Sequence, residues 1–115
     1  MITRLPGVYK GRSRAVQHNG IVYAVATDQS YADGIEEQTQ LTLAALEKNL
    51  QDAGSDKTRI LQATVYLTDM SMKARMDAVW CEWIGDQENW PQRACVGTDL
   101  AGETLIEVVV TAAVL

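Results

Sequence analysis

The stretch LIEVVVTAAVL, residues 105–115, is the most informative about the fold of this 115-residue chain. It is apolar on successive residues and is interrupted by one charge, Glu107. A strand with one face in water alternates apolar and polar residues, whereas a continuous apolar run is typical of a strand covered on both faces. The stretch therefore predicts a strand that needs a partner layer on each side of its sheet.

The segment RAVQHNGIVYAVA, residues 14–26, has the pattern of two short strands joined by a tight turn. Asn19 and Gly20 supply the positive backbone angles that a two-residue hairpin turn requires. His18 precedes them and is the only histidine, so we interpret it as a polar residue of the turn. The segment predicts a β-hairpin.

A long amphipathic helix is predicted for EEQTQLTLAALEKNLQDAG, residues 36–54. Asp33 and Glu36 have the spacing of a capping box, in which the aspartate accepts from free backbone N–H groups and the glutamate reaches back. Gly54 is expected to end the helix. The leucines recur at helical spacing on one face, which we assign to the core: Leu43, Leu46 and Leu50.

A strand is predicted for RILQATVYLTD, residues 59–69, because β-branched and aromatic residues suit a pleated sheet. Asp69 or Ser71 is expected to cap a second helix. Two further strands are predicted, at about 92–98 and from 104 onward. The core face of the second helix follows i, i+3, i+4, i+7, i+8 spacing: Met76, Val79, Trp80, Trp83 and Ile84.

The predicted order of elements, ββαβαββ, belongs to the α+β class: a mixed sheet with both helices packed on one face, in one domain over residues 1–115. Two helices on one face leave the other face of the sheet uncovered. An apolar strand such as residues 105–115 needs cover on that face too, and self-association through it supplies the cover. The sequence therefore favours an oligomer.

Composition and charge exclude several classes of function. The net charge of −5 and the pI near 4.7 argue against a nucleic-acid binder, because phosphate contacts need a positive surface. No apolar stretch reaches the ~20 residues of a membrane span, and no signal-peptide core is evident, so we expect a cytoplasmic protein without a membrane partner. Cys81 and Cys95 form no CxxC or Cys/His pattern and are expected to be reduced thiols. No metal cluster or phosphate loop is evident, so no cofactor is expected.

Three basic residues alternate along YKGRSR, residues 9–14: Lys10, Arg12 and Arg14. If the segment is extended, alternation places all three on one face. That face is either a solvated strand surface or a small patch that attracts anions.

A charge stands in each of the last two predicted strands, Arg93 in PQRACVG (residues 91–97) and Glu107. A buried arginine cannot lose its charge, so it needs a carboxylate or other acceptors around its planar fork. A glutamate among apolar residues can reach a pKa useful for moving protons near neutral pH. Either the two residues form an anion clamp with a proton-transfer group, or they pair with each other.

The stretches PQRACVG and LIEVVVTAAV resemble the C-terminal signature of the Rid family, the YjgF-type reactive-intermediate deaminases. Residues 36–70, EEQTQLTLAALEKNLQDAGSDKTRILQATVYLTDM, are similar to the helix, loop and strand of that family. The resemblance covers about residues 16–114. It implies a homotrimer of chorismate-mutase-like α+β subunits, in which the sheets form an inner barrel and pockets lie between subunits.

The resemblance also implies an activity. Family members hydrolyse enamines and imines such as 2-aminoacrylate, 2-iminopropanoate and 2-iminobutanoate to 2-keto acids and ammonia. Arg93 would clamp the substrate carboxylate, Cys95 would offer backbone polar groups near the imine nitrogen, and Glu107 would activate water and pass protons. Tyr9 or Arg12 would complete the pocket, in place of a tyrosine that the family has near position 12.

Two other functions are weighed against this one. The N-terminal segment departs from the family pattern, and a trimer that binds small carboxylates such as 2-keto acids without hydrolysis would explain that departure. RNA cleavage is disfavoured because the chain is acidic and lacks a basic surface interleaved with aromatic residues.

Overall fold

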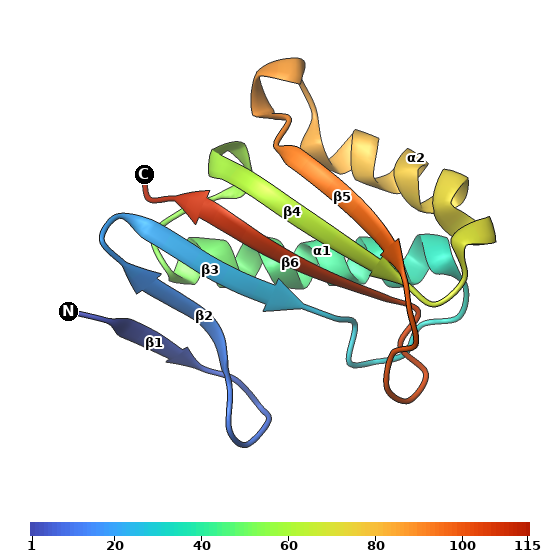
Figure 1. Ribbon diagram of the computed structural model, residues 1–115, viewed down its shortest axis with the longest axis horizontal. Coiled ribbons are helices and arrows are strands. Elements are labelled where there is room, and N and C mark those ends of the chain that lie inside the picture. Colours follow the sequence, from blue (N-terminus) through green and yellow to red (C-terminus); the bar gives the residue numbers. More distant parts are fainter.

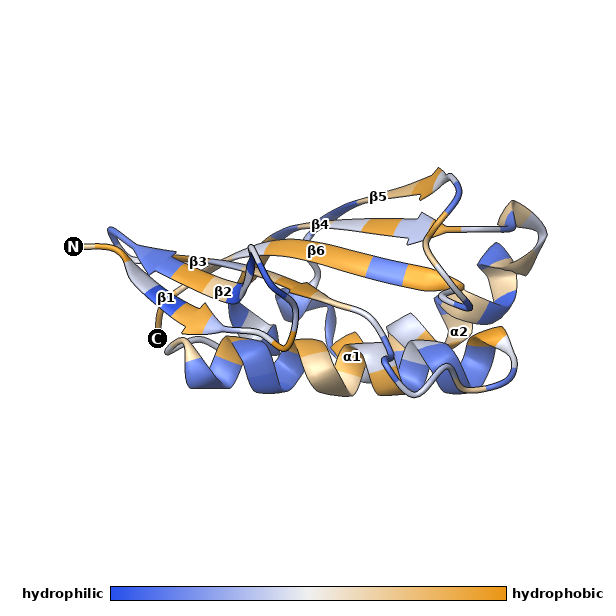
Figure 2. Cartoon of the chain, turned by 90° about the horizontal axis from the view of Figure 1, so that it is seen from below, coloured by the Kyte–Doolittle hydropathy of each residue, from blue (hydrophilic) through white to orange (hydrophobic).

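The structure, a computed structural model, describes residues 1–115 as one six-stranded sheet with both long helices on the same face (Figures 1 and 2). The strands lie in the order β1-β2-β3-β6-β4-β5, and only the β4–β5 pair is parallel. None of the helices has both the length and the apolar character needed to cross a membrane. The elements are β1 Thr3–Pro6, β2 Ser13–His18, β3 Ile21–Ala26, α1 Ile35–Asp52, β4 Ile60–Leu67, α2 Lys73–Ile84, β5 Gln92–Gly97 and β6 Ile106–Ala113, with short 3-10 turns η1 Lys57–Arg59, η2 Met70–Met72 and η3 Gln87–Asn89.

The predicted α+β class and helix placement are confirmed, with one strand more than the order ββαβαββ contained. The additional strand, β1, pairs antiparallel with β2 at the edge of the sheet. It has only four residues, TRLP, and most of it is exposed, so no alternation marked it. Its register shifts at Pro6, a residue that sheets accept at edges because it has no N–H to donate.

Strand β6 lies inside the sheet, between β3 and β4. Its alternate residues Ile106, Val108 and Val110 are buried in the core beneath the helices. Val109 points to the other face, where 40% of its surface is exposed. No helix covers that face, as Figure 2 shows. The second partner layer that the sequence predicted is therefore absent from a single subunit.

The predicted capping box at the start of α1 is wrong. The residue before the helix is Gly34, with a φ of 81°, and no side chain caps the helix. The carboxylate of Glu36 accepts two hydrogen bonds from Arg75, at 2.7 and 2.8 Å. Arg75 on α2 therefore pairs with the carboxylate that a capping box would use.

The predicted end of α1 is confirmed, whereas Asp69 caps the 3-10 turn η2 and not α2 itself, which follows Met72 without a side-chain cap. Helix α1 ends at Asp52, and Gly54 follows in the left-handed region at a φ of 92°. The Ser55 N–H reaches back to the carbonyl of Leu50 at 2.8 Å, which satisfies one of the free carbonyls at the helix end. Asp69 accepts from the Ser71 N–H at 2.9 Å and starts the turn η2 that leads into α2.

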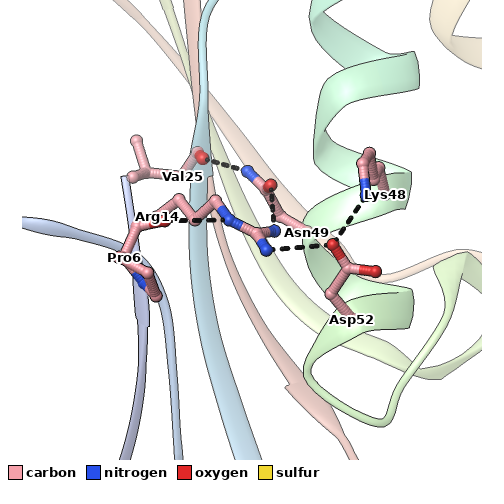
Figure 3. A network of polar contacts seen from close by, with 6 residues as sticks. All are labelled: Pro6, Arg14, Val25, Lys48, Asn49 and Asp52. Atoms are coloured by element: carbon pink, nitrogen blue, oxygen red, sulfur yellow. Dashed lines mark hydrogen bonds and ion pairs between the residues drawn. The ribbon is translucent and has the colours of Figure 1, made fainter. Parts of the chain in front are cut away.

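The N-terminal strands are tied to α1 through Arg14, whose contacts Figure 3 shows. Its guanidinium donates to the Pro6 carbonyl at 3.1 Å and to Asn49 Oδ1 at 2.9 Å, and it lies 3.0 Å from Asp52. Asn49 in turn donates to the Val25 carbonyl at 3.0 Å. One arginine therefore joins β1, β2 and the end of the helix.

The basic residues near the N-terminus do not share one face, contrary to that prediction. Lys10 lies in the turn between β1 and β2, and Arg14 is taken up by its contacts to α1. The guanidinium of Arg12 lies over the ring of Tyr9, 4.5 Å from its centroid. A continuous strand would have been needed to align the three charges, and the turn at Gly11 interrupts it.

Thr42 on α1 carries a buried hydroxyl that has no hydrogen-bond partner. Valine has the same branched shape without the polar atom, so Thr42→Val is expected to raise the free energy of unfolding by about 1 kcal/mol, measured by urea denaturation. Ser55→Ala is the control of opposite sign, because the buried Ser55 hydroxyl donates to the Ala113 carbonyl at 2.6 Å. A loss of stability in Thr42→Val would mean that its hydroxyl has a partner after all.

Candidate active site

Arg93 lies on β5, the strand at one edge of the sheet (Figure 1). Its side chain points to the helix side, where it contacts Asp77 of α2. Its register partner on β4 is Ala63, a buried residue of the core face. Only 18% of the arginine side chain is exposed. The guanidinium is therefore reached from solvent over a small part of its surface.

Side chains of α2 surround the guanidinium of Arg93. Its Nη2 donates to Asp77 Oδ1 at 2.6 Å, its Nη1 lies 3.9 Å from the sulfur of Met76, and its centre lies 5.2 Å from the centroid of the Trp80 ring. A guanidinium has five N–H donors, so these contacts leave three for another acceptor. Strand and helix together hold a charged fork with free donors.

Asp77 is shared between two cations. Its second oxygen, Oδ2, lies 2.7 Å from Nζ of Lys73, one turn earlier on the same helix. Burial raises the pKa of Asp77, but hydrogen bonds from Lys73 and Arg93 outweigh that effect and hold the pKa below its usual range. Asp77 is therefore ionised at neutral pH.

Cys95 lies two residues after Arg93 on the same face of β5 and packs against the core. Burial raises the pKa of its thiol above the usual range, although the charge of Arg93 acts in the opposite direction. The thiol is protonated at neutral pH, so it is a poor nucleophile. Cys95 and Cys81 are both free, as predicted.

Glu107 does not meet Arg93 within the subunit. It alternates with the buried residues of β6 and so points to the uncovered face, opposite Tyr66 of β4. Arg93 and Glu107 therefore do not pair with each other within the subunit, where Asp77 is the ionic partner of the arginine. Sequence spacing could not separate these cases, since a shift of one residue moves a side chain to the other face.

Tyr9 and Arg12, the other predicted site residues, lie at the far end of the sheet. They belong to the turn between β1 and β2, whereas Arg93 is on β5 at the opposite edge (Figure 1). Four strand spacings separate β2 from β5, which is roughly 20 Å. Arg93, Glu107 and the Tyr9–Arg12 pair can meet only if a second copy of the chain contributes some of them.

The subunit also has a surface cleft of about 340 Å³ that the sequence did not indicate. Leu61 and Trp90 line it, with Arg59 and Glu88 at its charged side. None of the predicted site residues lines this cleft. No three of the His, Cys, Asp and Glu side chains come together as metal ligands would.

The sequence analysis missed Asp77 and Lys73, the two charged neighbours of Arg93. Their i, i+4 spacing on a helix was visible in the sequence, and so was their position beside the core residues Met76 and Trp80. The pairing of β5 with β4 places Arg93 beside α2. It brings Arg93 into contact with Asp77, which lies 16 positions earlier in the sequence.

Comparison with known proteins relates almost the whole chain to one family. A family model described as Endoribonuclease L-PSP matches residues 5–114. A RutC family protein from Haemophilus ducreyi is 39% identical over 118 residues, covering 99% of this chain and 97% of that protein. The RutC family protein YoaB of Escherichia coli is 35% identical over 72 residues, 63% of each chain.

A solved structure has the same fold over the same length. The crystal structure of NMB1025, a member of the YjgF protein family from Neisseria meningitidis, matches with a TM-score of 0.93 and 32% identity. The match covers 100% of this chain and 96% of that one. Both the Arg93 strand and the Glu107 strand lie inside the matched residues.

Proposed function

Because this chain belongs to the endoribonuclease L-PSP family, which includes the YjgF, RutC and Rid proteins, we propose that it hydrolyses reactive enamines and imines of the 2-aminoacrylate type to 2-keto acids and ammonia. One observation carries the proposal. A nearly buried arginine presents three unused N–H donors at the edge of the sheet, a shape suited to the carboxylate of a small molecule.

The reaction needs positioning and proton transfer. Arg93 binds the substrate carboxylate, and the backbone polar groups at Cys95 lie near the imine nitrogen. An enamine first takes a proton on carbon and becomes an iminium ion. Glu107 then removes a proton from a water molecule as the water oxygen bonds to the iminium carbon, which gives a neutral carbinolamine. Glu107 returns that proton to nitrogen, and ammonia leaves as the C–N bond breaks, the hydroxyl loses its proton and the C=O bond forms. The protonated thiol of Cys95 agrees with a mechanism that has no covalent intermediate.

The site that we propose lies between subunits of a homotrimer. Two observations support this assembly. Glu107 and Arg93 point to opposite faces of one sheet, so a site that uses both takes them from different copies. The uncovered face also carries apolar side chains with no cover in the subunit, among them Tyr23, Leu61 and Val109. Sheets that face one another in a barrel would bury them.

The test is the rate at which the full-length protein releases 2-keto acid from an imine that an amino-acid dehydratase produces in the cuvette. The wild type is expected to accelerate the release over buffer, and Glu107→Gln to lower kcat by about 100-fold or more, because it removes the proton-transfer group. The amide of this variant cannot accept the proton but keeps the shape, so binding of 2-oxobutanoate, measured by calorimetry, should persist. Equal rates with the wild type, with Glu107→Gln and with buffer would refute the proposed hydrolysis.

A binding role without hydrolysis is the second candidate. It is favoured by the arrangement within one subunit, where Arg93 is fixed for an anion and Glu107 faces away. Tight binding of 2-oxobutanoate without turnover of the imine would support it. RNA cleavage, which the family description names, is disfavoured by the net charge of −5.

A further inference from the structure

We propose that Asp77 is a positioning residue that holds the Arg93 guanidinium with its unused donors turned toward the substrate. The inference rests on the proposed function for its effect on catalysis, but the contacts that carry it are independent of any substrate. Asp77 lies on α2, and the arginine that it holds lies on β5. Without this contact, the edge strand would carry a long flexible cation beside the core.

Three contacts fix the orientation of the Arg93 guanidinium. The ring of Trp80 lies 5.2 Å from its centre, Asp77 accepts from Nη2 at 2.6 Å, and the sulfur of Met76 lies 3.9 Å from Nη1. An aromatic neighbour limits the tilt of a guanidinium, whereas a single short charge-assisted bond limits its rotation. Asp77 therefore supplies the directional contact of the three.

Asp77 leaves the clamp free to bind an anion. It uses one oxygen on one nitrogen of Arg93, and its other oxygen lies 2.7 Å from Nζ of Lys73. A bidentate carboxylate would occupy two donors of the fork; this one occupies a single donor. Two cations and one carboxylate also give the cluster a net charge of about +1, which still attracts a monocarboxylate.

The contact is stronger than an ordinary surface ion pair, because the Arg93 side chain is 18% exposed and that of Asp77 is 30% exposed. Partial burial weakens screening by solvent and salt, and both oxygens of the carboxylate are engaged. The same helix that buries Trp80 in the core thus also fixes the acid that orients the arginine.

The chain offers a matched control in Asp52. On α1 this aspartate also joins a lysine one turn earlier, Lys48, to an arginine of a strand, Arg14 (Figure 3). Asp52 lies far from Arg93, on the part of α1 that meets β1 and β2. Asp52→Ala therefore removes the same kind of bridge without touching the candidate site.

The experiment compares Asp77→Ala, Asp77→Asn and Asp52→Ala in the full-length protein. Asp77→Ala is expected to raise the Kd for 2-oxobutanoate, and the KM for the imine, by at least about tenfold, with a smaller change in kcat. Asp77→Asn keeps an oxygen that accepts from Arg93, so it should restore Kd to near the wild-type value. Asp52→Ala should leave Kd unchanged. A lower Kd in Asp77→Ala would overturn the proposal, since it would make Asp77 a competitor of the substrate.

A second readout needs no ligand. The side-chain N–H signals of Arg93 in a ¹H–¹⁵N NMR spectrum, assigned with Arg93→Lys, should be sharp in the wild type and in Asp77→Asn and broadened in Asp77→Ala. Unchanged signals in Asp77→Ala would overturn the positioning role even if the protein proves to be a deaminase. Broadened signals in a protein that neither binds 2-oxobutanoate nor hydrolyses imines would uphold positioning and refute the proposed function instead.

Discussion

Arg93→Ala is expected to lower kcat/KM for imine hydrolysis by about 100-fold or more, because it removes the charged planar fork that binds the substrate carboxylate in the proposed site. The loss should fall mainly on KM, and binding of 2-oxobutanoate should become undetectable by calorimetry. Arg93→Lys keeps the positive charge without the planar guanidinium, so its kcat/KM should lie between those of the wild type and of Arg93→Ala. Release of 2-keto acid by Arg93→Ala at the wild-type rate would remove Arg93 from the mechanism.

A loss of folding must be separated from a loss of binding in Arg93→Ala. The arginine lies against Trp80 and neutralises Asp77, so its removal leaves a partly buried carboxylate with Lys73 alone. Arg75→Ala is the matched control: Arg75 lies on α2, and it binds Glu36 through two nitrogens at 2.7 and 2.8 Å. If circular dichroism shows both variants folded and only Arg93→Ala fails to bind 2-oxobutanoate, the effect belongs to the site.

The pH dependence of the Asp77 contact follows from the direction of its shift. Burial raises the pKa of Asp77, but hydrogen bonds from Lys73 and Arg93 hold it below its usual range, so the contribution of its ion pairs is fully present above the pKa of an unfolded aspartate. It is lost as the pH falls through the lowered pKa. Neutral-pH assays therefore keep Asp77 charged throughout, and changes in activity between pH 6 and 8 must come from other groups.

The sequence predicted those elements of the fold that a local pattern of residues marks. Alternation and turn chemistry located the β2–β3 hairpin, where Asn19 and Gly20 adopt φ angles of 51° and 79°. Helical spacing located the buried face of α2, including Met76 and Trp80. Strand β1 was missed because four mostly exposed residues carry no pattern, and it is held by its pairing with β2 and by the Arg14 contact to Pro6.

The candidate site was predictable in its residue types but not in their arrangement. A charge in a strand that was expected to be buried indicated that Arg93 needs a partner. Strand β5 is instead a mostly exposed edge strand, but the Arg93 side chain is only 18% exposed and does have an ionic partner. Which acid pairs with Arg93 depends on the face of β5 to which the arginine points and on the helix that packs against that face. Glu107 was the nearest acid within a strand, yet Asp77 is the one that tertiary packing brings to 2.6 Å.

Val109→Asp is expected to dissociate the proposed homotrimer and to abolish the proposed imine hydrolysis, because it places a charge at the centre of the uncovered sheet face. Val109 stands on β6, the inner strand, opposite Val25 of β3 and Thr64 of β4. An unpaired carboxylate buried between sheets costs several kcal/mol, whereas the same carboxylate on a free subunit stays in water. Its side chain lies on the far side from the core, so the subunit itself should keep its helices.

Leu41→Asp is the matched control for Val109→Asp, since both side chains are apolar and 40% exposed in the subunit. Leu41 lies on α1, the layer on the other side of the sheet. Analytical ultracentrifugation should show a smaller particle for Val109→Asp and an unchanged one for Leu41→Asp. If Val109→Asp stays assembled and active, the uncovered sheet face is not the interface. If Leu41→Asp dissociates instead, the interface lies on the helix side and not on the uncovered sheet face.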